Sequence, residues 1–178
     1  MADTPLPSPE LLRQLLTYDA DTGLLYWKRR PQEMFTVTGV FRMWNTRYAG
    51  REAFALVGSH GYKYGRLFKR GLLGHRVVFA LVHGHWPSTE IDHINGIRTD
   101  NRVSNLREVS SSENSRNCAL RINNISGVLG VHRVASGKWV AQICGRHVGC
   151  FSSLKAAHLA RRSAEAELGY HVNSGRSA

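Results

Sequence analysis

The polar segment IDHINGIRTDNRVSNLREVSSSEN, residues 91–114, constrains the fold of this chain more than any other stretch. It contains one Asp-His step and four Asn residues but few apolar ones. Asn costs free energy when it is buried without a hydrogen-bonding partner, and it gains little from apolar packing. We predict a hairpin with strands at residues 91–94 and 106–109 and a turn at Gly96, followed by a helix that begins at about Ser111 or Ser112 and has a Ser cap.

The composition predicts a loop-rich α+β protein. A length of 178 residues favours one or two small domains. A hydrophobic content of 42% can build a core, whereas 17 Gly, 5 Pro and no low-complexity tract argue against a helical bundle. The chain has no apolar run of about 18 residues and no basic-then-apolar start. We therefore expect no membrane partner and a cytoplasmic location.

The three cysteines are predicted to be small buried or half-buried thiols. Cys118, Cys144 and Cys150 form no CxxC pair, and an odd number argues against a disulfide framework or a structural zinc site.

The net charge points to a polyanionic partner. The chain carries 24 Lys and Arg against 13 Asp and Glu, a net charge of +11. Residues 1–90 and 126–178 each carry a net +5, whereas residues 91–125 carry +1. Nucleic acid is the leading candidate for such an excess. A basic solvated surface without such a partner is about equally compatible with the charge alone.

Short-range patterns predict the elements before the polar segment. In chain order these are a helix over 9–17, a strand over 24–28, two strands over 51–58 and 62–68, and an apolar helix over 75–87 that Gly84 and Pro87 end. The aromatic and basic alternation of the two middle strands favours a small sheet with one cationic face.

The pattern changes at Ser126, after a linker-like stretch. Three short strands are predicted over 128–134, 137–144 and 146–151, with Trp139, Ala141 and Ile143 on one apolar face. A helix over 153–168 should follow, capped by Ser152 and ended by Gly169. Its predicted buried stripe is Leu154, Ala157, Ala160, Ala164 and Leu168.

The residue types in the polar segment suit phosphodiester hydrolysis. That reaction needs an activated water and a stabilised 3′ leaving oxygen. The neutral imidazole of His93 can accept a proton near pH 7, and Asp92 and Asn114 offer the hard oxygen ligands that Mg²⁺-type ions prefer. Asp92 and His93 should point to opposite faces of a regular strand. The amide of Asn105 should cross-link the loop and so fix His93.

The run DHINGIRTDNRVSNLREVSSSEN resembles the HNH, or ββα-metal, motif of phage-type homing and free-standing endonucleases. The stretches TGLLYWKRRP and HRVVFALVHGHWP resemble the lead-in of that group, so the resemblance covers about residues 17–118. It implies that His93 is the general base, Asn105 the structural middle residue, and Asp92 and Asn114 the metal ligands. The final Asn, where some relatives have His, favours Mg²⁺ or Mn²⁺ over zinc. His75 and Arg76 are possible phosphate contacts, although a packing role is the alternative for His75.

Residues 126–170 resemble the AP2 DNA-binding domain, a three-stranded sheet packed on one helix. The matching elements include Gly137-Lys138-Trp139, Ala141-Gln142-Ile143 and Gly149-Cys150-Phe151. Strand alternation gives the expected DNA contacts as His132, Lys138, Gln142 and His147, with Arg133 and Arg146 at the rim. The sequence departs from the pattern at Val134 and Cys144, where basic residues are common, so phosphate docking is a firmer expectation than base reading.

These expectations combine into a metal-dependent HNH DNA endonuclease that uses Mg²⁺ or Mn²⁺, binds double-stranded DNA and nicks one strand per engagement as a monomer or weak dimer. Its predicted parts are a β-rich, DNA-contacting lead-in over 1–74, the nuclease motif over 75–118, a linker over 119–125, the AP2-like domain over 126–172 and a tail over 173–178. The location would be the host cytoplasm if a phage encodes the chain. The alternative is a non-catalytic AP2-type DNA-binding regulator with an inactive HNH motif; an RNA-binding protein is weaker, because no aromatic stacking platform is apparent.

Overall fold

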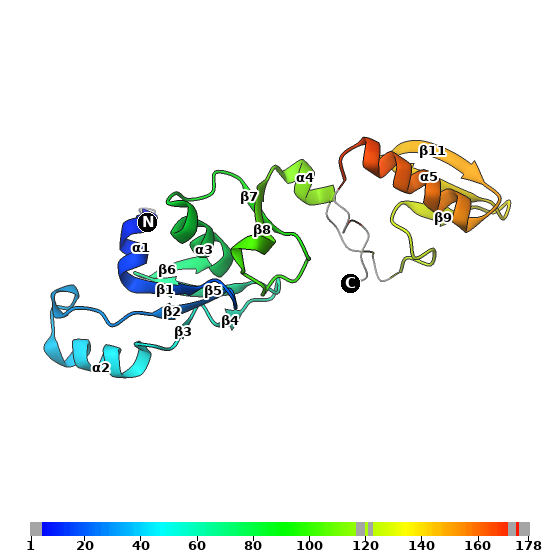
Figure 1. Cartoon of the computed structure of the whole chain (residues 1–178). Helices are drawn as coiled ribbons and strands as arrows, with labels where there is room; N and C mark the ends of the chain where they lie inside the picture. Colours follow the sequence, from blue (N-terminus) through cyan, green and yellow to red (C-terminus); the bar gives the residue numbers. More distant parts are fainter. Residues whose placement is uncertain (1–4, 117–119, 121–122, 171–173, 175–178) are drawn as a thin grey trace. The chain divides into compact units, whose positions relative to one another are not determined.

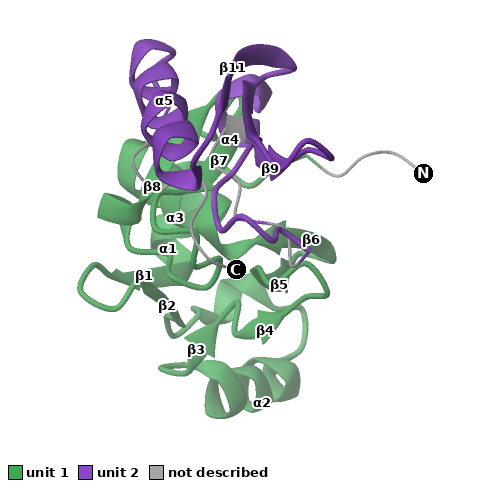
Figure 2. Cartoon of the chain, turned by 90° about the vertical axis from the view of Figure 1, so that its right-hand side faces the viewer, with its two compact units in different colours: residues 1–109 green, residues 110–178 purple. Residues whose placement is uncertain are grey.

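The computed structural model describes residues 5–116, 120, 123–170 and 174 (Figure 1). These residues form two compact units, 1–109 and 110–178 (Figure 2). The described part contains helices together with four small antiparallel sheets, so the mixed α+β class is confirmed. Cys118 and, apart from Ser174, the predicted tail lie outside the described residues.

The first unit consists of short elements. Its helices are α1 (Pro9–Leu15), the 3₁₀ helix η1 (Gln32–Met34), α2 (Thr38–Tyr48), α3 (Gly74–His83) and the 3₁₀ helix η2 (Val103–Asn105). Its strands are β1 (Leu16–Asp19), β2 (Leu24–Trp27), β3 (Glu52–Ala53), β4 (Leu56–Val57), β5 (Lys63–Leu67), β6 (Arg70–Leu73), β7 (Glu90–His93) and β8 (Leu106–Val109). They form the sheets β1-β2-β3, β4-β5-β6 and β7-β8.

One hydrophobic core joins the lead-in to the predicted nuclease hairpin. Leu12 and Leu15 of α1 and Val77 and Val78 of α3 are completely buried. Ile91 and Leu106 belong to the same core cluster. The hairpin is therefore supported on one side by elements that precede it in the chain by up to about 80 residues.

The β7–β8 hairpin forms where the sequence predicts it. Its register pairs Asp92 with Arg107 and His93 with Leu106. Successive residues of a strand point to opposite faces of the sheet, so Asp92 and His93 lie on opposite faces. Each shares its face with the residue that it pairs with on β8. Both are buried, at 7% and 3% exposure, which shows that both faces of the hairpin are covered at this point.

The lead-in differs from its prediction in several places. The helix α2 occupies a stretch that no pattern predicted, and β6 was also missed. The strand predicted over 51–58 is wrong as one strand, because Phe54 adopts a φ of 58° and breaks it into β3 and β4. Helix α1 ends at Leu15 because Leu16 is already extended and begins β1. Helix α3 ends at His83, before the left-handed Gly84.

The second unit begins with α4 (Ser111–Arg116) and continues with β9 (Val131–Arg133), β10 (Trp139–Ile143), β11 (Arg146–Phe151) and α5 (Leu154–Glu167). The three strands form a meander in the order β11-β10-β9, and α5 packs on it. Val131, Ala141 and Ala157 form the core, with Trp139 packed against it as the alternation predicts.

Helix α5 differs from its prediction in its N-terminal cap and in the residues that it buries. The cap is Ser153, whose Oγ accepts a hydrogen bond from the Ala156 amide, and not Ser152. Ala157 is fully buried, but the other residues buried on this helix are Arg161 and Glu165, which form an ion pair of 3.1 Å. Leu168, which is predicted to be buried, is 40% exposed. A paired arginine and glutamate thus take part of the place expected for apolar residues.

Candidate functional site

The side chain of His93 is held by Asn101. His93 Nε2 lies 3.1 Å from Asn101 Oδ1, and the contact is buried. An amide oxygen can only accept, so the imidazole carries its proton on Nε2 and Nδ1 is the basic nitrogen. The sequence pattern assigns no role to Asn101, whereas the structure places it in contact with the predicted general base.

Residues of the lead-in hold the backbone around Asn101 in place. The hydroxyl of Tyr18, on β1, donates to the Asn101 carbonyl at 3.3 Å and accepts from the Val103 amide at 2.8 Å. A Cβ at Gly23 would lie 2.7 Å from the Asn101 carbonyl carbon, and one at Gly74 would lie 3.0 Å from its Nδ2. The close approaches of Gly23 to its backbone and of Gly74 to its side-chain amide therefore leave Asn101 little freedom to move.

Two aromatic rings surround His93. The ring centroids of His75 and Tyr62 lie 5.1 and 5.7 Å from that of His93. Burial lowers the pKa of His93, while the hydrogen bond that it donates to Asn101 and the nearby carboxylates of Asp92 and Asp100 act in the opposite direction. The lowered pKa keeps the imidazole neutral near pH 7, which is the form that accepts a proton.

His75 and Arg76 make structural contacts at the start of α3. His75 is 4% exposed, and its Nδ1 has no hydrogen-bonding partner among the described residues. Burial, together with His93 and Arg76, lowers the pKa of His75 to about 3. Arg76 donates to the carbonyls of Thr89 and Pro87, both at 2.9 Å. Their contact with phosphate stays a prediction.

Asn105 braces the loop between the two strands. Its Oδ1 accepts from the Asn95 amide at 2.9 Å, and its Nδ2 donates to the Asp100 carbonyl at 2.9 Å. Its own carbonyl accepts from the Ile94 amide at 2.9 Å. These bonds span the loop that carries Asn101, so Asn105 positions His93 through that loop.

A residue that the sequence reasoning missed, Asp100, organises the same loop. It accepts a two-pronged contact from Arg102 at 2.8 and 2.6 Å and a hydrogen bond from Asn95 Nδ2 at 2.7 Å. These donors lower the pKa of Asp100 to about 2, with the Arg102 hydrogen bond as the largest cause. The Asp-x-Arg spacing at 100–102 is the signal that would have indicated it.

The predicted metal ligand Asp92 is paired with an arginine. Arg107 Nε and Nη2 both donate to Asp92 Oδ2, at 3.0 and 2.7 Å. The carboxylate is 8% exposed and the guanidinium side chain 30%. A carboxylate that binds a metal through one oxygen commonly accepts hydrogen bonds at the other, so this pairing is compatible with a metal-ligand role.

Asn114, the other predicted ligand, lies on α4 in the second unit, where its amide donates to the Ser110 carbonyl at 2.9 Å. The metal site that it is predicted to share with Asp92 stays a prediction. Within the described ranges, no cluster of three His, Cys, Asp or Glu side chains is arranged to hold a metal ion. An oxygen-only donor pair of one carboxylate and one amide fits Mg²⁺ or Mn²⁺ chemically.

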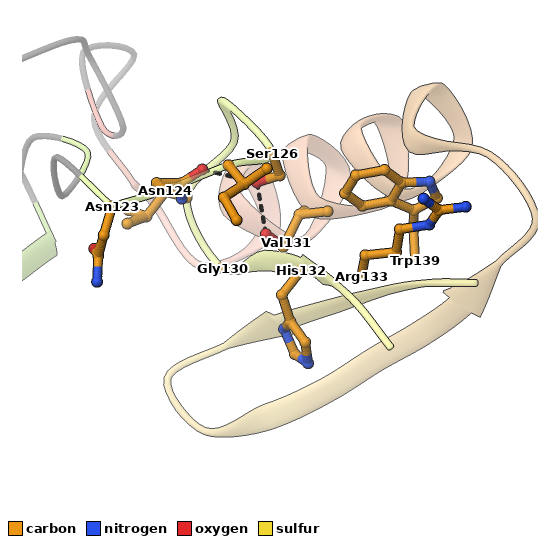
Figure 3. Close-up of a pocket in the computed structure, with 10 residues that line it drawn as sticks. Asn123, Asn124, Ser126, Gly130, Val131, His132, Arg133 and Trp139 are labelled. Carbon is orange, nitrogen blue, oxygen red and sulfur yellow. Dashed lines mark hydrogen bonds between the residues drawn. The ribbon is translucent and has the colours of Figure 1, made fainter. Parts of the chain in front are cut away.

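The six predicted DNA contacts of the second unit are all exposed: His132, Arg133, Lys138, Gln142, Arg146 and His147. Gln142 pairs with His147 across β10 and β11, so these two share a face. Arg133 pairs with Trp139 and points away from His132, beside a pocket of about 920 Å³ (Figure 3). Val134 and Cys144 are predicted on strands, but each follows a strand. Cys144 is in a turn, and its Sγ lies 2.8 Å from Tyr170 Oη. Cys144 and Cys150 are free but exposed, so the burial predicted for them is wrong.

Residues 73–116 match the family model described as HNH endonuclease. The matched span runs from just before α3 to the end of α4 and contains Asp92, His93, Asn105 and Asn114. It covers less than half of the 178-residue chain and supports an HNH nuclease in this segment. No curated protein and no solved structure matches the chain. Among the described helices, none combines the length and apolar character that crossing a membrane requires.

Proposed function

We propose that this protein is a metal-dependent HNH endonuclease that hydrolyses phosphodiester bonds in double-stranded DNA. The observation that carries the proposal is the buried pairing of His93 Nε2 with Asn101 Oδ1, inside the span that matches the HNH model. A histidine fixed in one tautomer and kept neutral by burial is suited to abstract a proton from water.

In the proposed reaction, His93 Nδ1 takes the proton of the attacking water, and Asn101 keeps the ring oriented through Nε2. Asn105 braces the loop that carries Asn101. A bound Mg²⁺ or Mn²⁺ supplies charge neutralisation at the phosphate and at the 3′ leaving oxygen. Asp92 and Asn114 are the residues proposed to hold it, and Arg107 orients Asp92.

The wider proposal concerns DNA engagement. The exposed residues of the AP2-like sheet supply sequence-independent phosphate contacts, each of which weakens as salt increases. One hairpin site acts on one strand per engagement, so a monomer or weak dimer nicks DNA. The homing-like character, a phage origin and a cytoplasmic location belong to the same proposal.

A plasmid assay with purified full-length protein tests this function. Wild-type protein with Mg²⁺ or Mn²⁺ should convert supercoiled plasmid to the nicked form, and EDTA should stop the reaction. His93→Ala should lower the nicking rate by at least about 100-fold, the lower end of the contribution of a general base. DNA binding should be nearly unchanged, and the matched control His158→Ala, an exposed histidine of α5, should nick normally.

Normal nicking by His93→Ala contradicts the assignment of the base. Binding of duplex DNA without cleavage in any divalent ion contradicts the nuclease and favours a DNA-binding regulator. Preference for RNA in a competition between RNA and DNA duplexes of one sequence contradicts the substrate class.

A further inference from the structure

We propose that the outer face of α2 is a second DNA-binding surface of the first unit, at a distance from the β7–β8 hairpin. The identity of the partner rests on the proposed function. The surface is defined by Arg42, Arg47, Val40 and Met43 on α2, with Arg51 immediately after the helix.

The inner face of α2 is rigidly anchored. Trp44 packs on Trp27 and Phe35, with ring centroids 5.8 and 6.1 Å apart. Asn45, 5% exposed, accepts from the Arg30 amide at 2.9 Å and donates to the Arg30 carbonyl at 3.0 Å. The Arg30 guanidinium lies 3.8 Å from the Trp44 ring centroid. The outer face is therefore presented by a fixed helix.

That outer face carries apolar side chains in contact with solvent. Val40 and Met43 are 43% and 59% exposed and lie three residues apart, so they share one side of the helix. Single exposed apolar residues are ordinary on protein surfaces. Val40, Met43 and Arg47 follow an i, i+3, i+7 spacing and so share one side of the helix, and Arg42 is next to Met43. Both arginines are exposed, and the other side of the helix already supplies its packing.

Positive charge is concentrated around this helix. Residues 28–51 contain six Lys and Arg but one acidic residue, Glu33, a net +5 that equals the net charge of all of residues 1–90. Arg30 is stacked on Trp44, and Lys28 donates to the Arg13 carbonyl. In the described part of the first unit, Arg29, Arg42 and Arg51 form no ion pair and are exposed.

Duplex DNA fits both properties of the surface. Its phosphates complement exposed guanidinium groups, and apolar side chains can contact the sugars and base edges inside a groove. An acidic protein would complement the charge, but it offers no comparable reason for exposed apolar side chains beside the arginines. In both views α2 lies at one end of the first unit and the β7–β8 hairpin toward the other (Figures 1 and 2). A contact there extends the DNA footprint beyond the cleavage site.

The test is the salt dependence of binding to a fluorescent 40-base-pair duplex of mixed sequence, without divalent metal, using full-length protein. Arg42→Ala with Arg47→Ala should reduce the slope of log affinity against log salt by about two, since each phosphate contact contributes about one. Lys155→Ala with His158→Ala, exposed on α5, is the control and should leave the slope within half a unit of wild type. Val40→Ser with Met43→Ser should weaken binding several-fold without changing the slope.

If the double arginine variant keeps the wild-type slope, α2 does not bind DNA and the proposal is overturned. That result also covers the alternative in which the surface binds an acidic protein. The outcome is separable from that of the nuclease proposal. If His93→Ala abolishes nicking while the arginine variant keeps its slope, the nuclease stands and the α2 surface fails. If wild-type protein never cuts but the arginine variant loses slope, the surface stands and the nuclease fails.

Discussion

Arg107, on the neighbouring strand, donates two hydrogen bonds to one oxygen of the Asp92 carboxylate. Its Nε and Nη2 lie 3.0 and 2.7 Å from Asp92 Oδ2, and the β7–β8 register sets the two residues directly opposite each other. The pairing has two consequences for a metal at Asp92. It fixes the orientation of the carboxylate, and it places a positive charge beside the site, which opposes the binding of another cation.

Replacing Arg107 with Met should separate these effects. The variant should bind Mn²⁺ more tightly in the absence of DNA, by roughly tenfold, because the competing charge is gone. It should also lose about 1–3 kcal/mol of unfolding free energy, since Asp92 stays buried without its partner while Arg107 is partly solvated. Titration calorimetry with Mn²⁺ and urea unfolding measure the two quantities.

Arg102→Met is the matched control for Arg107, because Arg102 makes a similar two-pronged contact with Asp100. It should leave the Mn²⁺ affinity unchanged. Weaker Mn²⁺ binding by Arg107→Met, with Arg102→Met unaffected, would show that orientation of Asp92 outweighs repulsion.

A second prediction concerns the tautomer of His93. Asn101→Ala removes the acceptor at Nε2, so the ring should populate both tautomers and kcat should fall by roughly 10- to 100-fold, the range seen when the group that orients a histidine is lost. KM should change less than kcat. The ¹⁵N shifts of the imidazole nitrogens report the tautomer without any need for activity. His158→Ala, at an exposed position on α5, should leave the His93 shifts unchanged.

Local patterns predicted the hairpin and the sheet of the second unit, and contacts between distant residues explain what was missed. The strand at 106–109 and the Asn105 brace follow from turn chemistry within a dozen residues. The Arg107–Asp92 pair depends on strand register, which single positions do not reveal. The role of Asn101 could not be predicted from local patterns, because its partner His93 lies across a loop. The Tyr18 hydroxyl that holds the Asn101 backbone comes from another sheet.

Helix α2 was missed for a different reason. Its buried side combines Phe41, Trp44 and Tyr48 with the polar Asn45, while Val40 and Met43 on the outer side are exposed. Apolar residues on both faces cancel the helical period on which a prediction relies. In α5 the opposite occurs: Arg161 and Glu165 are buried, although charged residues are normally assigned to solvent.

Asn105→Ala should loosen the loop that positions Asn101. The change leaves the Asn95 amide and the Asp100 carbonyl without their partner, at a cost of about 2–3 kcal/mol of unfolding free energy. Hydrogen exchange at the Asn95 amide should accelerate strongly. The Gly58 amide, bonded to Tyr62 in a different loop, is the internal reference and should exchange at its wild-type rate under native conditions. Unchanged protection at Asn95 would argue against the brace.

His75 should make the fold sensitive to acid. Its pKa falls from 6.5 to about 3 on folding, so between these values the unfolded chain binds more protons than the folded one. Stability from this residue is therefore complete above about pH 6.5 and is lost progressively as the pH falls toward 3. The unfolding free energy of wild type should drop between pH 7 and pH 5 more than that of His75→Gln. His60→Gln, at an exposed position, should keep the wild-type pH dependence; equal slopes for wild type and His75→Gln would contradict the prediction.

The buried ion pair of α5 gives the last prediction. Arg161 donates to Glu165 at 3.1 Å and also to the Gln142 carbonyl on β10, while Glu165 accepts a second contact from Arg162 at 3.0 Å. Arg161→Met should destabilise the second unit by about 3–5 kcal/mol, because Glu165 loses its buried partner. Adding Glu165→Leu should restore much of that loss, since replacing a whole buried pair by apolar residues is often neutral. Hydrogen exchange at the Ala157 amide measures both variants, and an unrestored double variant would show that the Arg161 contact with β10 dominates.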